Sequence, residues 1–194
     1  SDFYKMALDA DRRNKEGIAP VKPLLAELAA AQTKADLQKL QIKYAALGLG
    51  VDYGSYFAAD EKNVTMNIFN VLQGGLTLGA KDYYLNNDAA TVAIREAYKK
   101  YIAQMFQLYG FSAADAQKKA EKVFLHETNL ALISKSRTEL RDPQANYNKM
   151  TLKEFKENYP NIPLEALANA EGIKSEYIQQ MVVGQPAFLA GYDK

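Results

Sequence analysis

Apolar residues recur along most of this chain at steps of three and four, the spacing of one face of an α-helix. Pro23 introduces an Ala- and Leu-rich stretch over residues 24–31, and proline is tolerated in a first helical turn. Thr33 followed by Asp36 is typical of a capping box, and Gly48 ends the helical spacing that follows it. These patterns predict a helical hairpin near the start of the chain.

The pattern then changes to a period of two. Val64, Met66 and Ile68 alternate with residues of the opposite face, which is typical of a β-strand. Residues 53–59 are its expected partner. We therefore predict a small antiparallel pair inserted among helices, followed by an irregular segment that holds Asp82-Tyr83-Tyr84-Leu85.

Two long helices are predicted after this segment. Asp88 caps the first and Gly110 ends it, while Ser112 begins the second. The apolar stripe expected to face inward on the first helix is Ile94, Ala97, Tyr101, Met105 and Leu108. The corresponding face of the second is Ala116, Ala120, Val123, Phe124, Leu130 and Ala131. Because only a short turn separates them, the two helices should pack antiparallel.

The last part of the chain is expected to hold shorter elements. Thr151 with Glu154 predicts a capped helix that ends near residue 159, and residues 163–170 predict another. Residues 177–183 form a strand or an extended leg. With no internal repeat and no linker, the sequence predicts one body over 1–194, mainly α: a multi-helical lobe with antiparallel long helices and a small β-hairpin insertion.

Composition narrows the function classes. Lys and Arg number 24 against 23 Asp and Glu, a net charge of +1, and no basic stripe is present, which argues against a nucleic-acid binder. No apolar run approaches the roughly 20 residues that span a bilayer, so the chain is expected to be soluble. Cysteine is absent, which excludes disulfides and thiolate metal sites.

His126-Glu127 is half of the His-Glu-x-x-His motif, in which two imidazoles one helical turn apart bind zinc. The position of the second imidazole is occupied by Leu130, and the chain has one His in all. A catalytic zinc needs about three protein ligands, and a site built only of carboxylates suits calcium or magnesium better. We predict no metal site, and His126 as a surface residue.

Glu127 falls within the apolar stripe of its predicted helix. A buried carboxylate is costly unless it is paired or hydrogen-bonded, so we predict a partner, with Arg141 or Arg137 as candidates. A general-base role is the alternative, but the sequence places no nucleophile, metal or second acid beside it.

Gly74-Gly75-Leu76-Thr77-Leu78-Gly79 could be mistaken for a phosphate-binding loop. It lacks the Gly-Lys-Ser/Thr ending and the dinucleotide spacing. We interpret the glycines as positions that need backbone angles closed to other residues.

Several short strings carry a family resemblance through their order and spacing, and the last two are the most specific. They are Asp60-Glu61-Lys62-Asn63, Gly74 to Leu78 with Asp82 to Leu85, Glu127-x-x-Leu130-Ala131, Arg141-Asp142-Pro143, and Tyr147-Asn148-Lys149-Met150. Together they resemble the amino-terminal half of the neprilysin family of zinc endopeptidases. The chain departs from that family at Gly79-Ala80-Lys81, where Pro-x-Arg is common.

The resemblance implies a two-lobed enzyme in which a zinc-bound water attacks a peptide carbonyl. The zinc-binding helix would lie beyond this chain, so these residues would be a non-catalytic cover lobe that encloses the cavity and limits substrates to short peptides. Zinc would be the cofactor of the parent protein, and the missing catalytic lobe its partner. The resemblance also implies a bacterial, exported protein, periplasmic or extracellular. The residues that it marks as structural are Asp82, Tyr83, Tyr84, Glu127, Arg141, Asp142, Pro143, Tyr147 and Asn148.

Two other hypotheses about the function of the chain remain open. The chain could be an independent helical protein- or peptide-binding scaffold, or a lobe of a pseudo-enzyme. A reading frame that continues for several hundred residues and contains His-Glu-x-x-His would favour the peptidase. A continuation without the two histidines would favour the pseudo-enzyme. A lobe separated from its partner should also expose apolar surface and self-associate.

Overall fold

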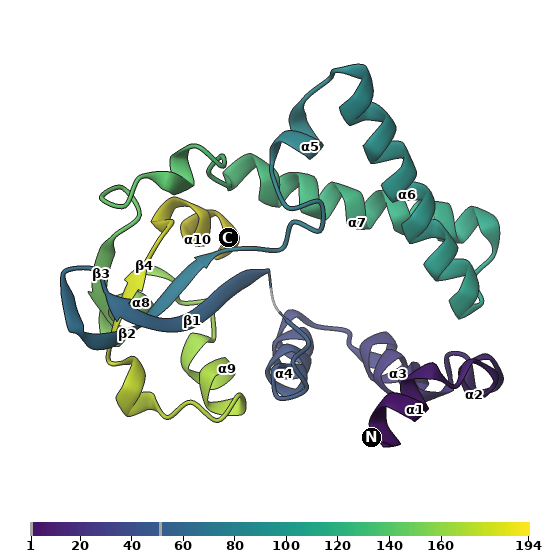
Figure 1. Cartoon of the computed structure of the whole chain (residues 1–194), viewed down its shortest axis with the longest axis horizontal. Coiled ribbons are helices and arrows are strands. Elements are labelled where there is room, and N and C mark those ends of the chain that lie inside the picture. Colours follow the sequence, from purple (N-terminus) through teal and green to yellow (C-terminus); the bar gives the residue numbers. More distant parts are fainter. Residues whose placement is uncertain (1, 51) are drawn as a thin grey trace.

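The computed structural model describes residues 2–50 and 52–194 (Figure 1). It is mainly helical with one small sheet, which confirms the predicted fold class. The α-helices are α1 (Asp2–Leu8), α2 (Ala10–Glu16), α3 (Lys22–Ala30), α4 (Lys34–Ala45), α5 (Asp82–Leu85), α6 (Ala89–Tyr109), α7 (Ala113–Ile133), α8 (Leu152–Asn158), α9 (Leu164–Ala170) and α10 (Pro186–Tyr192). The strands are β1 (Tyr53–Asp60), β2 (Asn63–Gln73), β3 (Asn148–Thr151) and β4 (Gln180–Val183), and the 3-10 turns are η1 (Ala19–Val21), η2 (Glu139–Arg141) and η3 (Ser175–Ile178).

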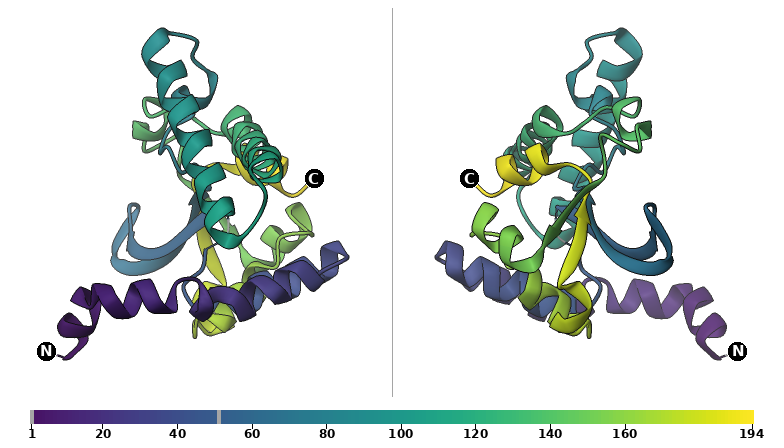
Figure 2. Two further views of the ribbon diagram at one scale, coloured as in Figure 1. Left: turned by 90° about the vertical axis from the view of Figure 1, so that its right-hand side faces the viewer. Right: turned by 90° about the vertical axis from the view of Figure 1, so that its left-hand side faces the viewer.

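Helices α1 and α2 extend as an arm from the rest of the chain (Figure 2). None of the residues described in α1, α2 and α3 is buried. The predicted hairpin of α3 and α4 is confirmed, since the Tyr44 hydroxyl donates to the carbonyl of Leu24 at 2.8 Å and Lys43 pairs with Glu27 at 2.7 Å. The capping box at Thr33 is also present.

The sheet has the strand order β1-β2-β4-β3. The predicted antiparallel pair is β1 and β2, and it is confirmed. The sheet is larger than predicted because β4 joins β2 in parallel and β3 joins β4 antiparallel. Strand β4 lies within residues 177–183, where a strand or an extended leg was predicted, but its pairing with β2 was not. Strand β3 has four residues, too few for a periodic pattern to stand out in the sequence.

The main core lies on one face of this sheet. Phe69 and Val71 of β2 and Met181 and Val183 of β4 point to this face and are buried. Side chains of the short helices cover them, among them Phe155, Leu164, Leu167, Phe188 and Leu189. Because successive residues of a strand point to opposite faces, Ile68 and Val182 lie on the other face (Figure 1). Among the described residues, those of η2 and the loop after it line this face together with the strands, and none of the α-helices does.

The two long helices α6 and α7 are joined by a tight turn at Gly110 and pack against each other, as predicted. They run antiparallel away from the turn, and Lys99 pairs with Glu121 about midway along both helices. Helix α5 lies between them farther from the turn (Figure 1). The residues predicted to face inward on α7 are buried or half-buried. Among the described helices, none combines the length and apolar character that a membrane crossing requires.

The inward stripe predicted for α6 is wrong. Ile94, Tyr101, Met105 and Leu108 are exposed, and Leu108 keeps 69% of its surface accessible. The residues of α6 that pack on α7 are Tyr98, Ile102, Ala103 and Phe106. Helix α6 is apolar over a wider arc than α7 covers, and helical periodicity does not reveal which part of such an arc meets a partner.

Candidate functional site

Glu127 of α7 is the centre of a buried hydroxyl network. Its Oε1 accepts hydrogen bonds from Thr77 at 2.7 Å and Tyr98 at 2.8 Å, and its Oε2 accepts one from Tyr84 at 2.5 Å. The Tyr84 hydroxyl accepts the amide of Leu78 at 3.0 Å. Burial raises the pKa of Tyr98 to about 12, so this hydroxyl remains a donor at neutral pH. The network joins the segment after β2 to α5, α6 and α7.

Glu127 is buried as predicted, with 6% of its surface exposed, but the predicted partner is wrong. Neither Arg141 nor Arg137 forms an ion pair with it within residues 2–50 and 52–194. Arg141 is exposed, and the guanidinium of Arg137 lies 5.7 Å from the ring centroid of Tyr83. Three neutral hydroxyls donate hydrogen bonds to this carboxylate instead. They come from positions distant in the sequence that the fold brings next to α7.

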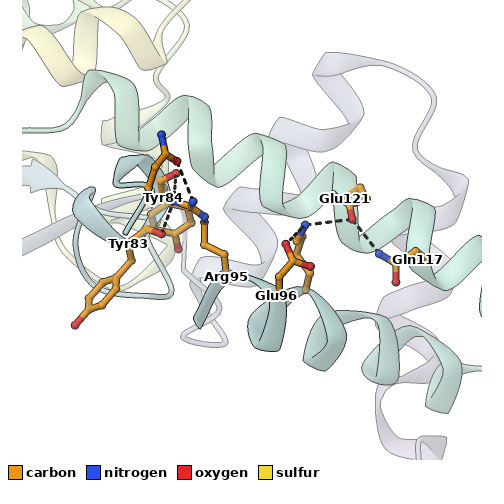
Figure 3. A network of polar contacts seen from close by, with 8 residues as sticks. Tyr83, Tyr84, Arg95, Glu96, Gln117 and Glu121 are labelled. Atoms are coloured by element: carbon orange, nitrogen blue, oxygen red, sulfur yellow. Dashed lines mark hydrogen bonds and ion pairs between the residues drawn. The ribbon is translucent and has the colours of Figure 1, made fainter. Parts of the chain in front are cut away.

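The Asp82–Leu85 segment is a turn of α-helix, α5, and the predicted irregular segment is wrong there. Arg95 of α6 fixes its end: Nη1 donates to the carbonyl of Tyr84 at 3.0 Å and to that of Asn86 at 2.5 Å (Figure 3). The last carbonyls of a helix have no partner within it, and a guanidinium satisfies two of them here. The ring of Tyr84 stacks on Phe124 of α7 at 5.6 Å.

A second polar network joins α6 to α7 at the surface (Figure 3). Lys99 lies 2.7 Å from Glu96 on its own helix and 3.6 Å from Glu121 on α7. Gln117 donates to the same Glu121 carboxylate at 2.9 Å. These contacts are solvated, so they contribute much less to stability than the buried bonds of Glu127.

Asp60 at the end of β1 is a second buried carboxylate, with 2% of its surface exposed. Lys149 of β3 lies 2.9 Å from its Oδ2, and the Tyr147 hydroxyl and the amide of Lys62 donate to its Oδ1 at 2.7 and 3.0 Å. The hydrogen bond from Lys149, with those from Lys62 and Tyr147, lowers the pKa of Asp60 to about 2. Asp60 therefore ties the β1–β2 hairpin to β3 as a carboxylate.

Arg141 is the last residue of η2, and Asp142 and Pro143 begin the loop that leads to β3. The Asp142 side chain fixes this turn: its Oδ1 accepts the amides of Gln144 and Ala145, both at 3.0 Å. The Arg141 side chain makes no hydrogen bond with the described residues. Its guanidinium is left free to bind another group.

The remaining residues marked by the resemblance lie apart from the two carboxylates. Asp82 is exposed in the first turn of α5, and Tyr83 is half-buried. The Asn148 amide donates to the carbonyl of Val183 on β4 at 3.0 Å. Of the residues that the sequence marked, Tyr84 thus bonds to Glu127 and Tyr147 to Asp60, whereas Asp82, Tyr83 and Asn148 bond to neither carboxylate.

His126 is exposed, and its Nε2 lies 2.9 Å from Asp52 Oδ2. In residues 2–50 and 52–194, no three His, Asp or Glu side chains lie close enough to share a metal ion. A catalytic zinc requires such a set. The described residues therefore do not fit a zinc site.

Gly75 supports the structural interpretation of the glycine-rich segment. Its φ is +76°, a conformation that residues with a Cβ rarely adopt. A Cβ at this position would lie 2.7 Å from Leu130 Cδ1 and 2.9 Å from Asp52 Cβ. The segment passes so close to α7 that only glycine fits.

Sequence reasoning did not mark several residues of these networks, among them Thr77, Tyr98, Asp60, Arg95 and Lys149. Asp60 opens the first of the short strings, so its place there was a usable signal. Thr77 lies within the Gly74 to Leu78 string and carried the same signal. Arg95 gave none, because its guanidinium acquires its role from residues that the fold brings to it.

Comparisons with known proteins agree on one family. The family model described as Peptidase family M13 matches residues 1–194. Neprilysin-3 of Drosophila melanogaster is 27% identical over 168 residues, which cover 81% of this chain and 21% of that protein. Endothelin-converting enzyme 1 of Bos taurus is 32% identical over 111 residues, 57% of this chain and 15% of that protein.

Solved structures agree with these relatives. The zinc metalloprotease Zmp1 of Mycobacterium tuberculosis in its open state matches with a TM-score of 0.86 and 27% identity, over 96% of this chain and 29% of that one. Zmp1 in complex with an inhibitor matches with a TM-score of 0.87. The chain thus spans about a fifth of the length of the curated relatives and less than a third of the solved structures.

Proposed function

The chain belongs to peptidase family M13, and from this premise we propose that it is the amino-terminal part of the cover lobe of a zinc metalloendopeptidase. Residues 1–194 would form a single non-catalytic lobe, and the rest of the polypeptide would bind the zinc and carry out hydrolysis. The observation that carries the proposal is the match to Zmp1, which covers 96% of this chain but 29% of the other.

The lobe would act by exclusion. A helical wall around the catalytic cavity would admit short, flexible peptides and reject folded proteins. The buried networks of Glu127 and Asp60 support this role, because a wall must hold its shape and each carboxylate joins elements that are distant in the chain. The marked residues would thus be structural, and the enzyme would act outside the cytoplasm, in the periplasm or extracellular space.

Zinc binding and peptidase activity of this chain test the proposal. After equilibration with zinc and dialysis, we expect less than stoichiometric metal by mass spectrometry and no cleavage of a quenched fluorescent peptide. Zmp1 is the positive control, and His126→Ala controls for zinc held loosely by the imidazole. One tightly held zinc per chain, or real turnover, would contradict the proposal.

The coding sequence of the parent gene provides a second test. The proposal requires a reading frame that continues beyond these residues and encodes His-Glu-x-x-His. A continuation without the two histidines would make the parent a pseudo-enzyme. A reading frame that stopped near Lys194 would favour the alternative hypothesis, an independent helical scaffold that binds proteins or peptides.

A further inference from the structure

A cleft of about 440 Å³ lies on the sheet face opposite the main core, and no residue of the described α-helices lines it. Ile68 of β2 and Val182 of β4 form its apolar floor, and both are buried. The hairpin residue Tyr56 lines one side, and the loop that holds Arg141 and Tyr147 lines the other. This volume lies within the range of pockets that enclose small ligands.

Internal hydrogen bonds hold the loop side of the cleft in place. Asn146 donates from Nδ2 to the carbonyl of Glu139 at 2.9 Å and to that of Asp142 at 2.6 Å. Its Oδ1 accepts from Gln185, next to the end of β4, at 3.0 Å. The Tyr147 hydroxyl is bound to Asp60, as described above. A preformed wall costs little ordering when a ligand binds.

Two opposite charges line this cleft without partners in the described structure. Arg141 lies on the loop side and Glu61 at the hairpin turn, and both are exposed. Neither makes an ion pair or a side-chain hydrogen bond with residues 2–50 or 52–194. Lys149 pairs with Asp60, so its charge is already compensated.

We propose that this cleft binds a short free peptide, with the terminal carboxylate on Arg141 and the terminal ammonium on Glu61. The guanidinium presents a fork of donors that matches a carboxylate, and Glu61 is an acceptor for an ammonium group. An apolar side chain in the middle of the peptide would lie over Ile68 and Val182. The inference stands independently of the proposed function, because it uses the chemistry of this cleft alone.

The test is calorimetric titration of the chain with the tripeptide Ala-Leu-Ala, its N-acetyl form and its C-terminal amide. The free tripeptide is expected to bind with a Kd of about 1 mM or below. Acetylation or amidation should each weaken binding by about tenfold, which is 1.4 kcal/mol.

Two variants assign the charges to the two ends. Arg141→Gln should lose about tenfold in affinity for the free tripeptide and become insensitive to amidation. Glu61→Gln should become insensitive to acetylation instead. Arg13→Gln, on the exposed arm, is the matched control and should bind as the unmodified chain does. Thermal melts establish that all three variants are folded.

Three results would overturn the inference. The first is no saturable binding of the free tripeptide at millimolar concentration. The second is equal binding of the free, acetylated and amidated forms, because the charges would then have no role. The third is equal sensitivity of Arg13→Gln and Arg141→Gln, which would indicate non-specific electrostatic attraction.

Discussion

Replacing Glu127 by Gln tests whether the hydroxyl network stabilises the fold. The variant keeps the side-chain shape but removes the charge and one acceptor. If the amide oxygen takes the place of Oε1, it still accepts from Thr77 and Tyr98. The amide nitrogen then faces the Tyr84 hydroxyl, which already accepts the amide of Leu78 and loses its own acceptor.

The cost follows from that lost bond. A hydrogen bond to a charged group contributes about 1.5–3 kcal/mol, and the two bonds that remain fall to neutral strength, about 0.5–1.5 kcal/mol each. The neutral amide is easier to bury than a carboxylate, which offsets the weakening of these two bonds. We therefore expect a loss of about 2 kcal/mol in the free energy of unfolding, or roughly 4–8 °C in Tm for a chain of this length.

Thermal and urea unfolding followed by circular dichroism measure this loss. Glu121→Gln on the same helix is the matched control, because that carboxylate is solvated and should change stability by less than about 0.5 kcal/mol. An unchanged Tm for Glu127→Gln would refute the reasoning. So would an equal loss in Glu121→Gln, which would point to a general effect of charge on α7.

Three further predictions follow from the same structure. In the folded chain the pKa of Asp60 is lowered to about 2, against about 3.9 in the unfolded chain. Its contribution to stability is therefore present above a pH of about 3.9 and is lost as the pH falls toward 2. Asp60→Asn should unfold more easily than the unmodified chain at pH 7 and no more easily near pH 2. Gly75→Ala should cost about 1–3 kcal/mol more than Gly79→Ala in chemical denaturation, because both glycines have positive φ but only the first would place a Cβ against other atoms, and equal costs would contradict this packing argument. The double variant Tyr101→Lys, Leu108→Lys should reduce self-association in sedimentation velocity without lowering Tm, since both side chains are exposed on α6, and a strictly monomeric unmodified chain at high concentration would remove the basis of this prediction.

Local features of the fold could be read from the sequence. The caps at Thr33, Asp88, Ser112 and Thr151 all formed as predicted. Each joins a side chain to an amide three residues away, so no tertiary contact is needed to recognise it. The alternation of β2 was equally local, and family membership followed from short strings whose order is itself a property of the sequence.

The partners of these elements were decided by the tertiary structure. Thr77 and Glu127 are 50 positions apart and Asp60 and Lys149 are 89 apart, so neither pair is marked by any spacing rule. Periodicity showed that Glu127 would be buried but could not show which donors would reach it. Likewise, α6 is apolar over a broad arc, and only the placement of α7 decides which part of that arc is covered. The chemistry of a side chain determines whether it must be buried or hydrogen-bonded. The tertiary fold determines which residues become its partners.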